Sequence, residues 1–426
     1  MIDYSNVIVE MGIKAKQAAR FLRIRTADEK NALLLEIATQ LELSKSEIIA
    51  ANSTDVADAR QSGLKETLVE RLTLTESRFN EMVDGLKQVV SLKDPVGEVD
   101  GMWLNEASLQ IGAKRVPLGV IAMIYESRPN VTVDATALCL KTGNAVILKG
   151  GSDALQTNEA LLKAIENALI KCEWPLGAVQ LVKTTDRDFT KQLLSAKAYL
   201  DCVIPRGGEG LIQFVASHSK VPMIETGTGN CHIFVDESYA IEDAVNIIIN
   251  AKVQRPGACN AVETVLVHKN IAHTALPEIF EALKTNGVFM ALCNRSYERA
   301  QDLKLDLNHC AIATEEDWRT EFLDFKIAIK VVDTLDEAIN HIEQYSTGHS
   351  EAILTENYTN AQYFLDHVDS AAVYVNASTR FTDGGQFGFG AEIGISTQKL
   401  HARGPMGLKA LTTIKYIVYG SGQIRS

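Results

Sequence analysis

The stretch PLGVIAMIYESRPNVTVDATALCLKTGNAVILKG, residues 117–150, decides the fold class of this chain. It contains two short apolar runs, at 119–124 and 145–148, each of a length typical of a buried strand. Residues 131–140 between them are long enough for a helix, and breaks that contain Pro129 and Gly143 separate this helix from the two runs. A strand, a helix and a second strand in this order predict a unit whose two strands are parallel.

The same alternation continues along the chain in two series. The first series adds apolar runs at 179–182, 202–204 and 222–224, with an amphipathic helix at 154–170. The second series has runs at 233–235, 262–268, 325–332, 351–354 and 372–375. Strands that alternate with helices at this spacing form doubly wound parallel sheets, so the sequence predicts an α/β fold with two such domains.

The segment before these series has a helical pattern. Over the first 90 residues, apolar side chains recur at helical spacing, as at Leu33, Leu34 and Ile37. Ser44 with Glu47 predicts a capping box at the start of one helix, and Thr75 is expected to cap another.

Two further segments predict an arm. Residues 96–116 are short runs broken by glycines, which is typical of a β-hairpin, and residues 412–419 form another β-rich run near the end of the chain. We expect this tail strand to pair with the hairpin, within one subunit or between subunits. The arm at 96–116 and 410–426 is therefore predicted to mediate oligomerisation.

Composition and charge exclude several classes of protein. The 426 residues are 46% hydrophobic and 23% charged, as in globular proteins, and the net charge of −12 argues against nucleic-acid binding. The N-terminal segment lacks the order of charged and apolar residues of a signal peptide, and no apolar stretch has the length of a membrane span. The cytoplasm is the expected location.

Cysteine and histidine patterns speak against metal and disulfides. The seven cysteines are widely spaced with no CxxC pair, which favours a reducing compartment, and the nine histidines form no HExxH motif. We therefore expect no metal site.

The usual nucleotide-binding motifs are absent from the sequence. No GxGxxG follows a predicted strand, and the nearest approach, Gly388 to Gly394, is one residue too long and lies outside a strand–helix junction. A Walker A loop is also missing. Two α/β domains still suggest a nucleotide cofactor, which would bind without the usual glycine pattern.

A series of motifs resembles the aldehyde dehydrogenase superfamily along essentially the whole chain. They are Pro117-Leu-Gly-Val-Ile, Arg128-Pro-Asn130, Thr142-Gly-Asn-Ala-Val-Ile-Leu-Lys149, Pro175-Leu-Gly-Ala-Val-Gln, Ile224-Glu-Thr-Gly227, Cys259 and Ser346-Thr-Gly348. The stretches YESRPNVTVDA, ILKGGSDA, IETGTGNCHIFVD, QRPGACNAVET, STGHSEAI and HARGPMGL resemble the branch that reduces L-glutamyl 5-phosphate.

This resemblance implies an activity and a domain plan. The activity is NADPH-dependent reduction of L-glutamyl 5-phosphate to L-glutamate 5-semialdehyde with release of phosphate, a step of proline biosynthesis. The implied dinucleotide-binding domain, with a Rossmann-like fold that lacks the glycine fingerprint, covers 1–95 and 117–228. The implied catalytic domain covers 229–400. A homo-oligomer and the preceding glutamate kinase are the implied partners.

The resemblance assigns three catalytic residues. Cys259 is the nucleophile, because a thiolate attacks an acyl phosphate and leaves a thioester that accepts hydride readily. Arg255 would favour the thiolate if its side chain turns inward. Asn130 matches the oxyanion donor that acts with the backbone N–H of the nucleophile, although an Asn at this place also fits a helix N-cap. Glu225, 34 residues before Cys259, matches the residue that activates water in hydrolytic relatives; here its role stays open between positioning and proton movement.

The resemblance also assigns the cofactor contacts. Lys149 matches the lysine at the adenosine ribose. Three residues later stands Ser152, where relatives that prefer NAD carry an acid; without a carboxylate to repel a 2′-phosphate, NADP is the expected cofactor. Glu321 matches the contact to the nicotinamide ribose, and Gly207 and Gly208 open a helix near the expected nicotinamide end.

Arginines suit the two anionic ends of the substrate, because the guanidinium fork binds carboxylate or phosphate bidentately. Arg128 and Arg380 are the candidates nearest to the motifs, followed by His349.

Three alternatives compete with this interpretation. A hydrolytic aldehyde dehydrogenase would share the fold, Cys259 and Glu225 but need no phosphate. A non-catalytic relative acting in binding or assembly is disfavoured by the joint presence of Asn130, Lys149 and Cys259. A zinc-dependent alcohol oxidoreductase would require clustered metal ligands.

Overall fold

The stretch that decides the fold class forms the predicted strand, helix and strand in the computed structural model, which describes residues 2–425. Strands β3 and β4 pair in parallel, β5 joins β4, and β6 joins β3 on its other side, all in parallel. The sheet order is β5-β4-β3-β6. The strands are β3 (Val120–Tyr125), β4 (Ala145–Lys149), β5 (Val179–Leu181) and β6 (Cys202–Arg206), and the helices that follow them are α6 (Asn130–Lys141), α7 (Leu155–Lys171), α8 (Arg187–Leu194) and α9 (Glu209–His218).

The chain divides into two compact units. The first unit runs up to Thr226 and includes Gly388–Gly394 and the tail from Met406, and the second unit comprises Gly227–Phe387 and Ile395–Pro405. The boundary expected from the sequence lies after residue 228.

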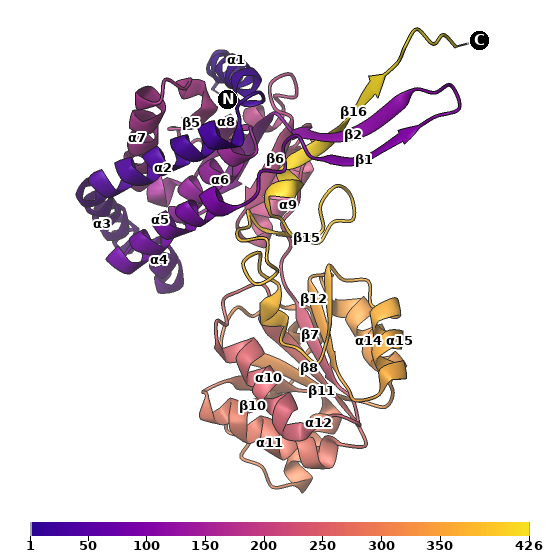
Figure 1. Cartoon of the computed structure of the whole chain (residues 1–426). Helices are drawn as coiled ribbons and strands as arrows, with labels where there is room; N and C mark the ends of the chain where they lie inside the picture. Colours follow the sequence, from indigo (N-terminus) through magenta and orange to yellow (C-terminus); the bar gives the residue numbers. More distant parts are fainter. Residues whose placement is uncertain (1, 426) are drawn as a thin grey trace. The chain divides into compact units, whose positions relative to one another are not determined.

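Within residues 2–425, five helices precede the sheet of the first unit (Figure 1). Thr75 caps α5 through the N–H of Arg78, as predicted. The capping box predicted at Ser44 is wrong, because Ser44 also ends α2 with its N–H bonded to Gln40, and its side chain makes no cap hydrogen bond. The helices are α1 (Ser5–Leu22), α2 (Ala27–Leu43), α3 (Lys45–Gln61), α4 (Glu66–Leu72) and α5 (Glu76–Ser91).

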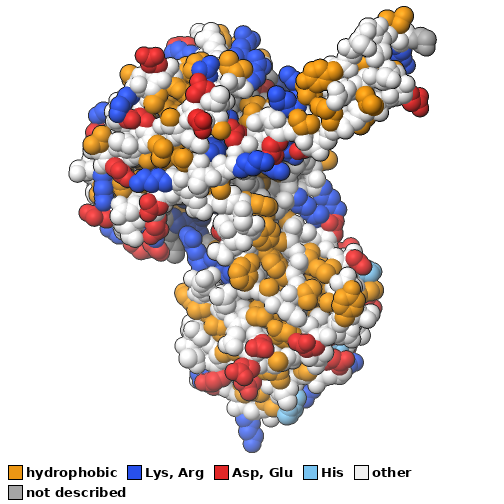
Figure 2. Space-filling model, viewed as in Figure 1, with side chains coloured by type: hydrophobic (Ala, Val, Ile, Leu, Met, Phe, Trp, Pro, Cys, Tyr) orange, Lys and Arg blue, Asp and Glu red, His pale blue; other side chains and the backbone are white. Residues whose placement is uncertain are grey.

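The predicted arm is a separate antiparallel sheet of the first unit. Strands β1 (Val99–Leu104) and β2 (Gln110–Pro117) form the hairpin, and β16 (Thr412–Tyr419) pairs with β2 along its whole length. The predicted pairing of tail and hairpin is thus confirmed within one chain. The arm extends away from the helices of its unit (Figure 1) and carries exposed hydrophobic side chains (Figure 2). These include Val99, Met102, Trp103, Leu104, Ile414, Tyr416, Val418 and Tyr419.

The second unit is built on a seven-stranded parallel sheet with the order β10-β9-β11-β8-β7-β12-β13. Its strands β8 and β13 have the predicted bounds, while β9 and β10 were missed. A cluster of aliphatic side chains, among them Ile233, Val265 and Ile329, packs against α10 and α11 to form the core. The strands are β7 (Cys231–Val235), β8 (Val262–His268), β9 (Phe289–Leu292), β10 (Cys310–Ile312), β11 (Lys326–Val332), β12 (Ser350–Leu354) and β13 (Ala372–Val375).

The helices of the second unit lie between these strands in the chain. They are α10 (Ile241–Val253), α11 (Ala272–Thr285), α12 (Asn294–Asp302), α13 (Glu315–Arg319), α14 (Leu335–Tyr345) and α15 (Tyr358–His367). Two short strands, β14 (Ile395–Ser396) and β15 (Gly404–Pro405), form a small antiparallel ribbon. The fold is therefore the predicted one, with two doubly wound parallel sheets.

The predicted strand at 222–224 is reduced to a single parallel bridge between Val203 and Met223. Within residues 2–425, no helix combines the length and the apolar character that crossing a membrane requires.

Candidate active site

Cys259 lies in a tight turn of the second unit, between the end of α10 and the start of β8. The N–H of Ala258 donates to the carbonyl of Arg255 at 3.1 Å, and the N–H of Ala261 donates to the carbonyl of Ala258 at 2.9 Å. The cysteine is partly buried. This places the thiol at the amino ends of the parallel strands β7 and β8.

The residues just before and at the start of β7 pack directly against this turn. A Cβ atom added to Gly229 would lie 1.4 Å from the carbonyl oxygen of Cys259, so only glycine fits. The thiol of Cys231 donates to the same carbonyl at 3.2 Å. Cys231 is fully buried, and burial raises the pKa of its thiol well above its usual range, so it stays protonated and able to donate. Cys231 thus holds the peptide of Cys259 in place.

Glu321, in the segment before β11, binds the same residues before β7. Its carboxylate accepts the N–H of Gly229 at 2.7 Å. The following segment is held in turn by the fully buried pair Lys252 and Glu263, whose Nζ and Oε2 atoms are 2.5 Å apart, because Glu263 also accepts the N–H of Leu323 at 3.2 Å. Burial raises the pKa of Glu263 to about 7, against the opposing effect of Lys252. Glu321, which the sequence predicts to contact the nicotinamide ribose, therefore also binds the backbone segment that supports the turn of Cys259.

Arg380 brackets the turn of Cys259. Its Nε donates to the side chain of Gln254 at 3.0 Å, and a second guanidinium nitrogen donates to the side chain of Asn260. Burial lowers the pKa of Arg380, the nearby charge of Arg255 lowers it further, and Cys259 acts in the opposite direction. The guanidinium of Arg380 therefore lies near the thiol of Cys259 and near the charge of Arg255.

His349 lies at the same edge of the sheet, directly before Ser350 at the start of β12. It is fully buried, and its Nδ1 atom is 2.8 Å from the hydroxyl of Ser350 and 3.8 Å from the sulfur of Cys231. Ser350 is bonded onward to Thr382 at 2.6 Å. The structure thus places His349 beneath the thiol turn.

In the first unit, the predicted residues follow the carboxyl ends of the strands. Asn130 is the first residue of α6, the N-cap is Pro129, and no side chain caps this helix, so the alternative of an Asn N-cap is wrong. The side-chain Nδ2 of Asn130 instead donates to Asp134 at 2.8 Å. Burial raises the pKa of Asp134 to about 6, opposed by this hydrogen bond and by the charge of Arg206.

Arg128 lies two residues before Asn130 in the same loop after β3. It is partly buried, and its N–H donates to the carbonyl of Glu126 at 2.5 Å. The loop is thereby turned back toward the end of β3.

Lys149 is the last residue of β4 and is buried. Its Nζ donates to the carbonyl of Gly150 at 2.9 Å, and burial lowers its pKa. The hydroxyl of Ser152 donates to Asp153 at 3.2 Å, and Asp153 also accepts the hydroxyl of Ser127 at 2.9 Å. A carboxylate therefore does lie beside Ser152, which corrects the charge argument that the sequence gave for NADP.

Gly207 and Gly208 lie between β6 and α9, as expected. The N–H of Gly208 donates to the carboxylate of Glu126 at 2.8 Å, and a Cβ atom at Gly207 would lie 2.6 Å from the same carboxylate. Glu225 lies in the segment alongside β6 and is partly buried, next to Thr226, which donates to the carbonyl of Pro205 at 2.8 Å.

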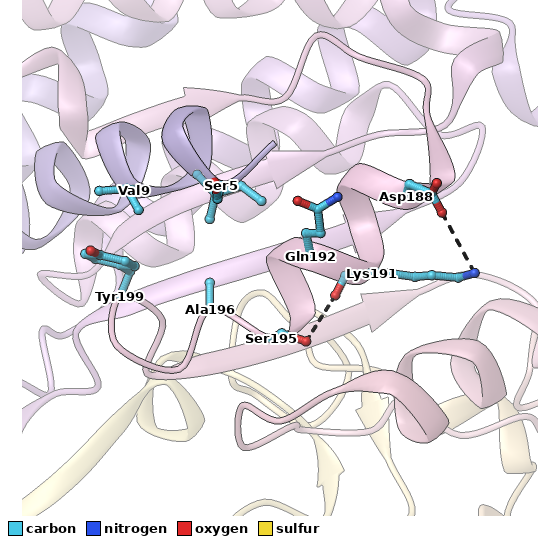
Figure 3. A pocket seen from close by; sticks show the side chains of 9 residues that line it. Ser5, Val9, Asp188, Lys191, Gln192, Ser195, Ala196 and Tyr199 are labelled. Carbon is cyan, nitrogen blue, oxygen red and sulfur yellow. Dashed lines mark hydrogen bonds and ion pairs between the residues drawn. The ribbon is translucent and has the colours of Figure 1, made fainter. Parts of the chain in front are cut away.

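A hollow of about 430 Å³ lies elsewhere in the first unit, between α1 and α8 (Figure 3). Ser5 and Val9 of α1 face Lys191, Gln192 and nearby residues across it. It contains none of the predicted site residues, so the candidate chemistry lies away from this hollow. Among the described residues, no group of three His, Cys, Asp or Glu side chains is arranged to hold a metal ion.

Sequence reasoning missed several residues of these two regions. Cys231, Asn260, Glu126 and Asp134 act through contacts with residues that stand as far as 122 positions away in the chain. The only usable signal was the i, i+4 spacing of Asn130, directly before the predicted helix, and Asp134 within it.

Comparisons with known proteins agree on one family. The model of the aldehyde dehydrogenase family matches residues 7–290. The chain is 55% identical over the full length of both proteins to gamma-glutamyl phosphate reductase of Clostridium tetani. It is 57% identical to that of Caldanaerobacter subterraneus, over 97% of this chain and 98% of the relative. The crystal structure of gamma-glutamyl phosphate reductase from Thermotoga maritima superposes with a TM-score of 0.94 at 53% identity, over 98% of this chain and all of that one.

Proposed function

Because the chain belongs to the aldehyde dehydrogenase family and, within it, to the gamma-glutamyl phosphate reductases, we propose the following account of its reaction. The protein reduces L-glutamyl 5-phosphate to L-glutamate 5-semialdehyde with release of phosphate, as a step of proline biosynthesis. The observation that carries the residue assignment is Cys259, a partly buried thiol on a turn that Gly229 and Cys231 hold in place.

The thiolate of Cys259 attacks the acyl carbon, the bond from carbon to the phosphate oxygen breaks, and phosphate leaves with the bonding electrons. The product is a thioester on Cys259. A nicotinamide cofactor, held by Lys149, Ser152, Gly207, Gly208 and Glu321, would supply the hydride that this thioester accepts. Collapse of the tetrahedral adduct breaks the carbon–sulfur bond, releases the aldehyde and restores the thiolate.

Asn130 is proposed as the side-chain donor to the oxyanion, together with the backbone N–H of Cys259. Its amide has two N–H donors; Asp134 accepts one of them, so the second stays available. Removal of such a donor costs about 10² to 10³ in kcat. Glu225 is proposed to position cofactor or substrate or to move a proton, since a reductase gains nothing from activating water.

The carboxyl end of the sheet in the first unit fits a nicotinamide dinucleotide. Helices α6, α7 and α9 begin after β3, β4 and β6, so that their positive ends gather at one edge. Lys149 is buried there, and it forms no ion pair among residues 2–425. We assign Lys149 and Ser152 to the adenosine ribose, Gly207 and Gly208 to the nicotinamide end, and Glu321 to the nicotinamide ribose. NADP is the proposed cofactor, on the strength of the resemblance.

Arg128, Arg380 and His349 are proposed as substrate residues. Arg380 has the strongest support, because its guanidinium is fixed on both sides of the thiol turn. His349 is buried beneath that turn, so its proposed contribution to substrate binding depends on the turn that it supports.

The proposed setting is a cytoplasmic homo-oligomer that receives its substrate from the preceding glutamate kinase. The exposed aromatic and aliphatic side chains on both faces of β1 and β16, such as Trp103 and Tyr416, support the arm as the assembly surface.

Steady-state assays of the reverse direction test this function. NADP reduction by glutamate semialdehyde is measured with and without phosphate, in the natural protein and in Cys259→Ala. We expect a rate that requires phosphate and is absent from the variant. A rate in the natural protein that is indifferent to phosphate would mean a hydrolytic aldehyde dehydrogenase with Glu225 as the general base.

A further inference from the structure

We propose that Arg255 and Arg380 form the subsite for the phosphate group of the substrate, directly beside Cys259. This inference rests on the proposed reductase reaction and assigns one end of its substrate. Both arginines belong to the second unit, as does the thiol.

Arg380 is held in a fixed orientation over the turn of the nucleophile. Its guanidinium donates to side chains of residues 254 and 260, which stand immediately outside the segment from Arg255 to Cys259. The side-chain amide of Asn260 donates to the carbonyls of Arg380 and Thr382, at 3.2 and 2.9 Å. The backbone carbonyl of Asn260 accepts a hydrogen bond from the hydroxyl of Thr379 at 2.7 Å. The segment that carries Arg380 is therefore fastened to the segment that carries the thiol.

The carboxylate of Asp383 offsets part of the positive charge at this place, because it acts to raise the pKa of Arg380. The acceptors of Arg380 are the neutral amides of Gln254 and Asn260, and Arg255 is exposed. Throughout the described part of the chain, neither guanidinium forms an ion pair with a carboxylate within 4.0 Å. Burial lowers the pKa of Arg380, and the nearby charge of Arg255 lowers it further. Two like charges held near each other without a carboxylate partner are stabilised by an anion that both can bind.

The chemistry of the substrate selects phosphate as that anion. The phosphate is attached to the carbon that Cys259 attacks, so it lies beside the thiol, whereas the α-carboxylate stands at the opposite end of the carbon chain. A phosphate group carries up to two negative charges and three terminal oxygens, which match two guanidinium forks better than a single carboxylate does.

The subsite acts in both directions of the reaction. In reduction, the departing phosphate takes the bonding electron pair and is received by the two arginines. In the reverse direction, the same pair holds inorganic phosphate while its oxygen attacks the thioester; the carbon–sulfur bond breaks and the thiolate of Cys259 is restored.

Protection of Cys259 against alkylation tests the subsite without turnover. The full-length protein is treated with iodoacetamide over a series of inorganic phosphate concentrations, and the modification of Cys259 is followed by peptide mass spectrometry. The variants are Arg255→Gln, Arg380→Gln and Arg380→Lys, with Arg299→Gln on the exposed face of α12 as the matched control.

We expect phosphate to protect the natural protein and the Arg299 variant equally. Because hydrogen bonds to charged groups contribute about 1.5–3 kcal/mol, each Gln variant should need at least about tenfold more phosphate. Arg380→Lys keeps the charge and should fall between. In the reverse assay, the KM for phosphate should rise while the KM for semialdehyde stays within about twofold, since the α-carboxylate binds elsewhere.

Two results would overturn the subsite alone. If phosphate protects all variants as well as the natural protein while the KM for semialdehyde rises, the arginines bind the α-carboxylate. If phosphate protection is unchanged and only the pH dependence of alkylation shifts upward, they serve the thiolate. A natural protein that phosphate does not protect, and whose turnover needs no phosphate, would instead overturn the proposed function.

Discussion

The two units place their candidate chemistry at opposite ends of their parallel strands. In the first unit, Asn130 and Gly207 follow the carboxyl ends of β3 and β6, and Lys149 is the last residue of β4. In the second unit, Cys259 and His349 precede the amino ends of β8 and β12. The first arrangement is the common one for doubly wound sheets, where ligands bind at the carboxyl ends next to the point at which strand order reverses.

This difference changes the source of positive charge. At the carboxyl ends of the first sheet, helix N-termini supply it through backbone N–H groups. The thiol of the second unit follows the C-terminus of α10, which is the negative end of a helix dipole and gives a thiolate no help. Arg255 and Arg380 supply the charge there instead. In the proposed site, side-chain charges therefore matter most at the thiol, and helix N-termini add to Lys149 at the carboxyl ends of the first sheet.

The largest effect is expected for Gly229→Ala in the second unit. The new Cβ atom would overlap the carbonyl of Cys259, so the turn must move and the thiol with it. Because a misplacement of about 1 Å costs on the order of 10² in rate, activity should fall below about 1% while NADPH binding is retained.

The matched control for this change is Gly210→Ala in α9, where a Cβ atom meets nothing within 4 Å. It should leave the rate of Cys259 alkylation unchanged. Normal activity in Gly229→Ala would show that the close packing of Gly229 against the turn of Cys259 does not position the thiol.

Lys149→Met should have the opposite effect to Gly229→Ala: it should weaken NADPH binding and leave the reactivity of Cys259 unchanged. Loss of a charge-assisted hydrogen bond, worth about 1.5–3 kcal/mol, should raise the Kd for NADPH about 10- to 100-fold, as measured by fluorescence titration. Cys259 should react with iodoacetamide at the natural rate. The exposed Lys163 on α7, changed to Met, is the control. An unchanged Kd in Lys149→Met would remove this lysine from the cofactor site.

Cys231→Ala tests the hydrogen bond that holds the nucleophile's peptide. A neutral hydrogen bond of about 0.5–1.5 kcal/mol predicts a fall in kcat of roughly 2- to 12-fold, with the KM for NADPH unchanged. Cys231→Ser keeps a donor and should recover most of the rate. Cys139→Ala, at a buried thiol of the first unit, should lower only the melting temperature. Equal losses in the Ala and Ser variants would mean that Cys231 acts by packing.

The smallest effect concerns pH and the support of Asn130. The pKa of Asp134 is about 6, so its carboxylate is ionised above that pH and accepts the Asn130 N–H strongly; below it, the protonated group accepts weakly. We expect kcat to rise about two- to fivefold as pH increases through 6, since charge-assisted hydrogen bonds are roughly twice as strong as neutral ones. Asp134→Asn should lose this step, and its persistence in a pH profile of the variant would assign it to another group.

The sequence predicted those features that local pattern determines. Short runs rich in β-branched residues predicted the bounds of β8 and β13, and the glycine-broken hairpin with a β-rich tail predicted the three-stranded arm. Strands β9 and β10, with four and three residues, were missed. At Ser44 the local pattern misled, since α2 runs directly into α3 and leaves no room for an extended cap.

Cys259 and Lys149 could be proposed from the sequence because each stands in a motif of its own, and their roles stay predictions. The residues that support the site could not be proposed in this way, because Cys231, Asn260 and Glu126 act on partners that only the fold brings close. The positions of two residues in the sequence do not show how close their side chains lie in the folded chain. The carboxylate of Asp153 beside Ser152 was missed for the same reason, because its position depends on the turn after β4.

The central claim is that a thioester on Cys259 is resolved by phosphate and not by water. Its most direct test is a rapid-mixing measurement of NADPH formation from glutamate semialdehyde and NADP without phosphate. We predict a burst of one NADPH per active site followed by a stop, with Cys259 acylated in the mass spectrum, and steady turnover once phosphate is added. Steady turnover without phosphate, or a burst that leaves Cys259 unmodified, would contradict the account.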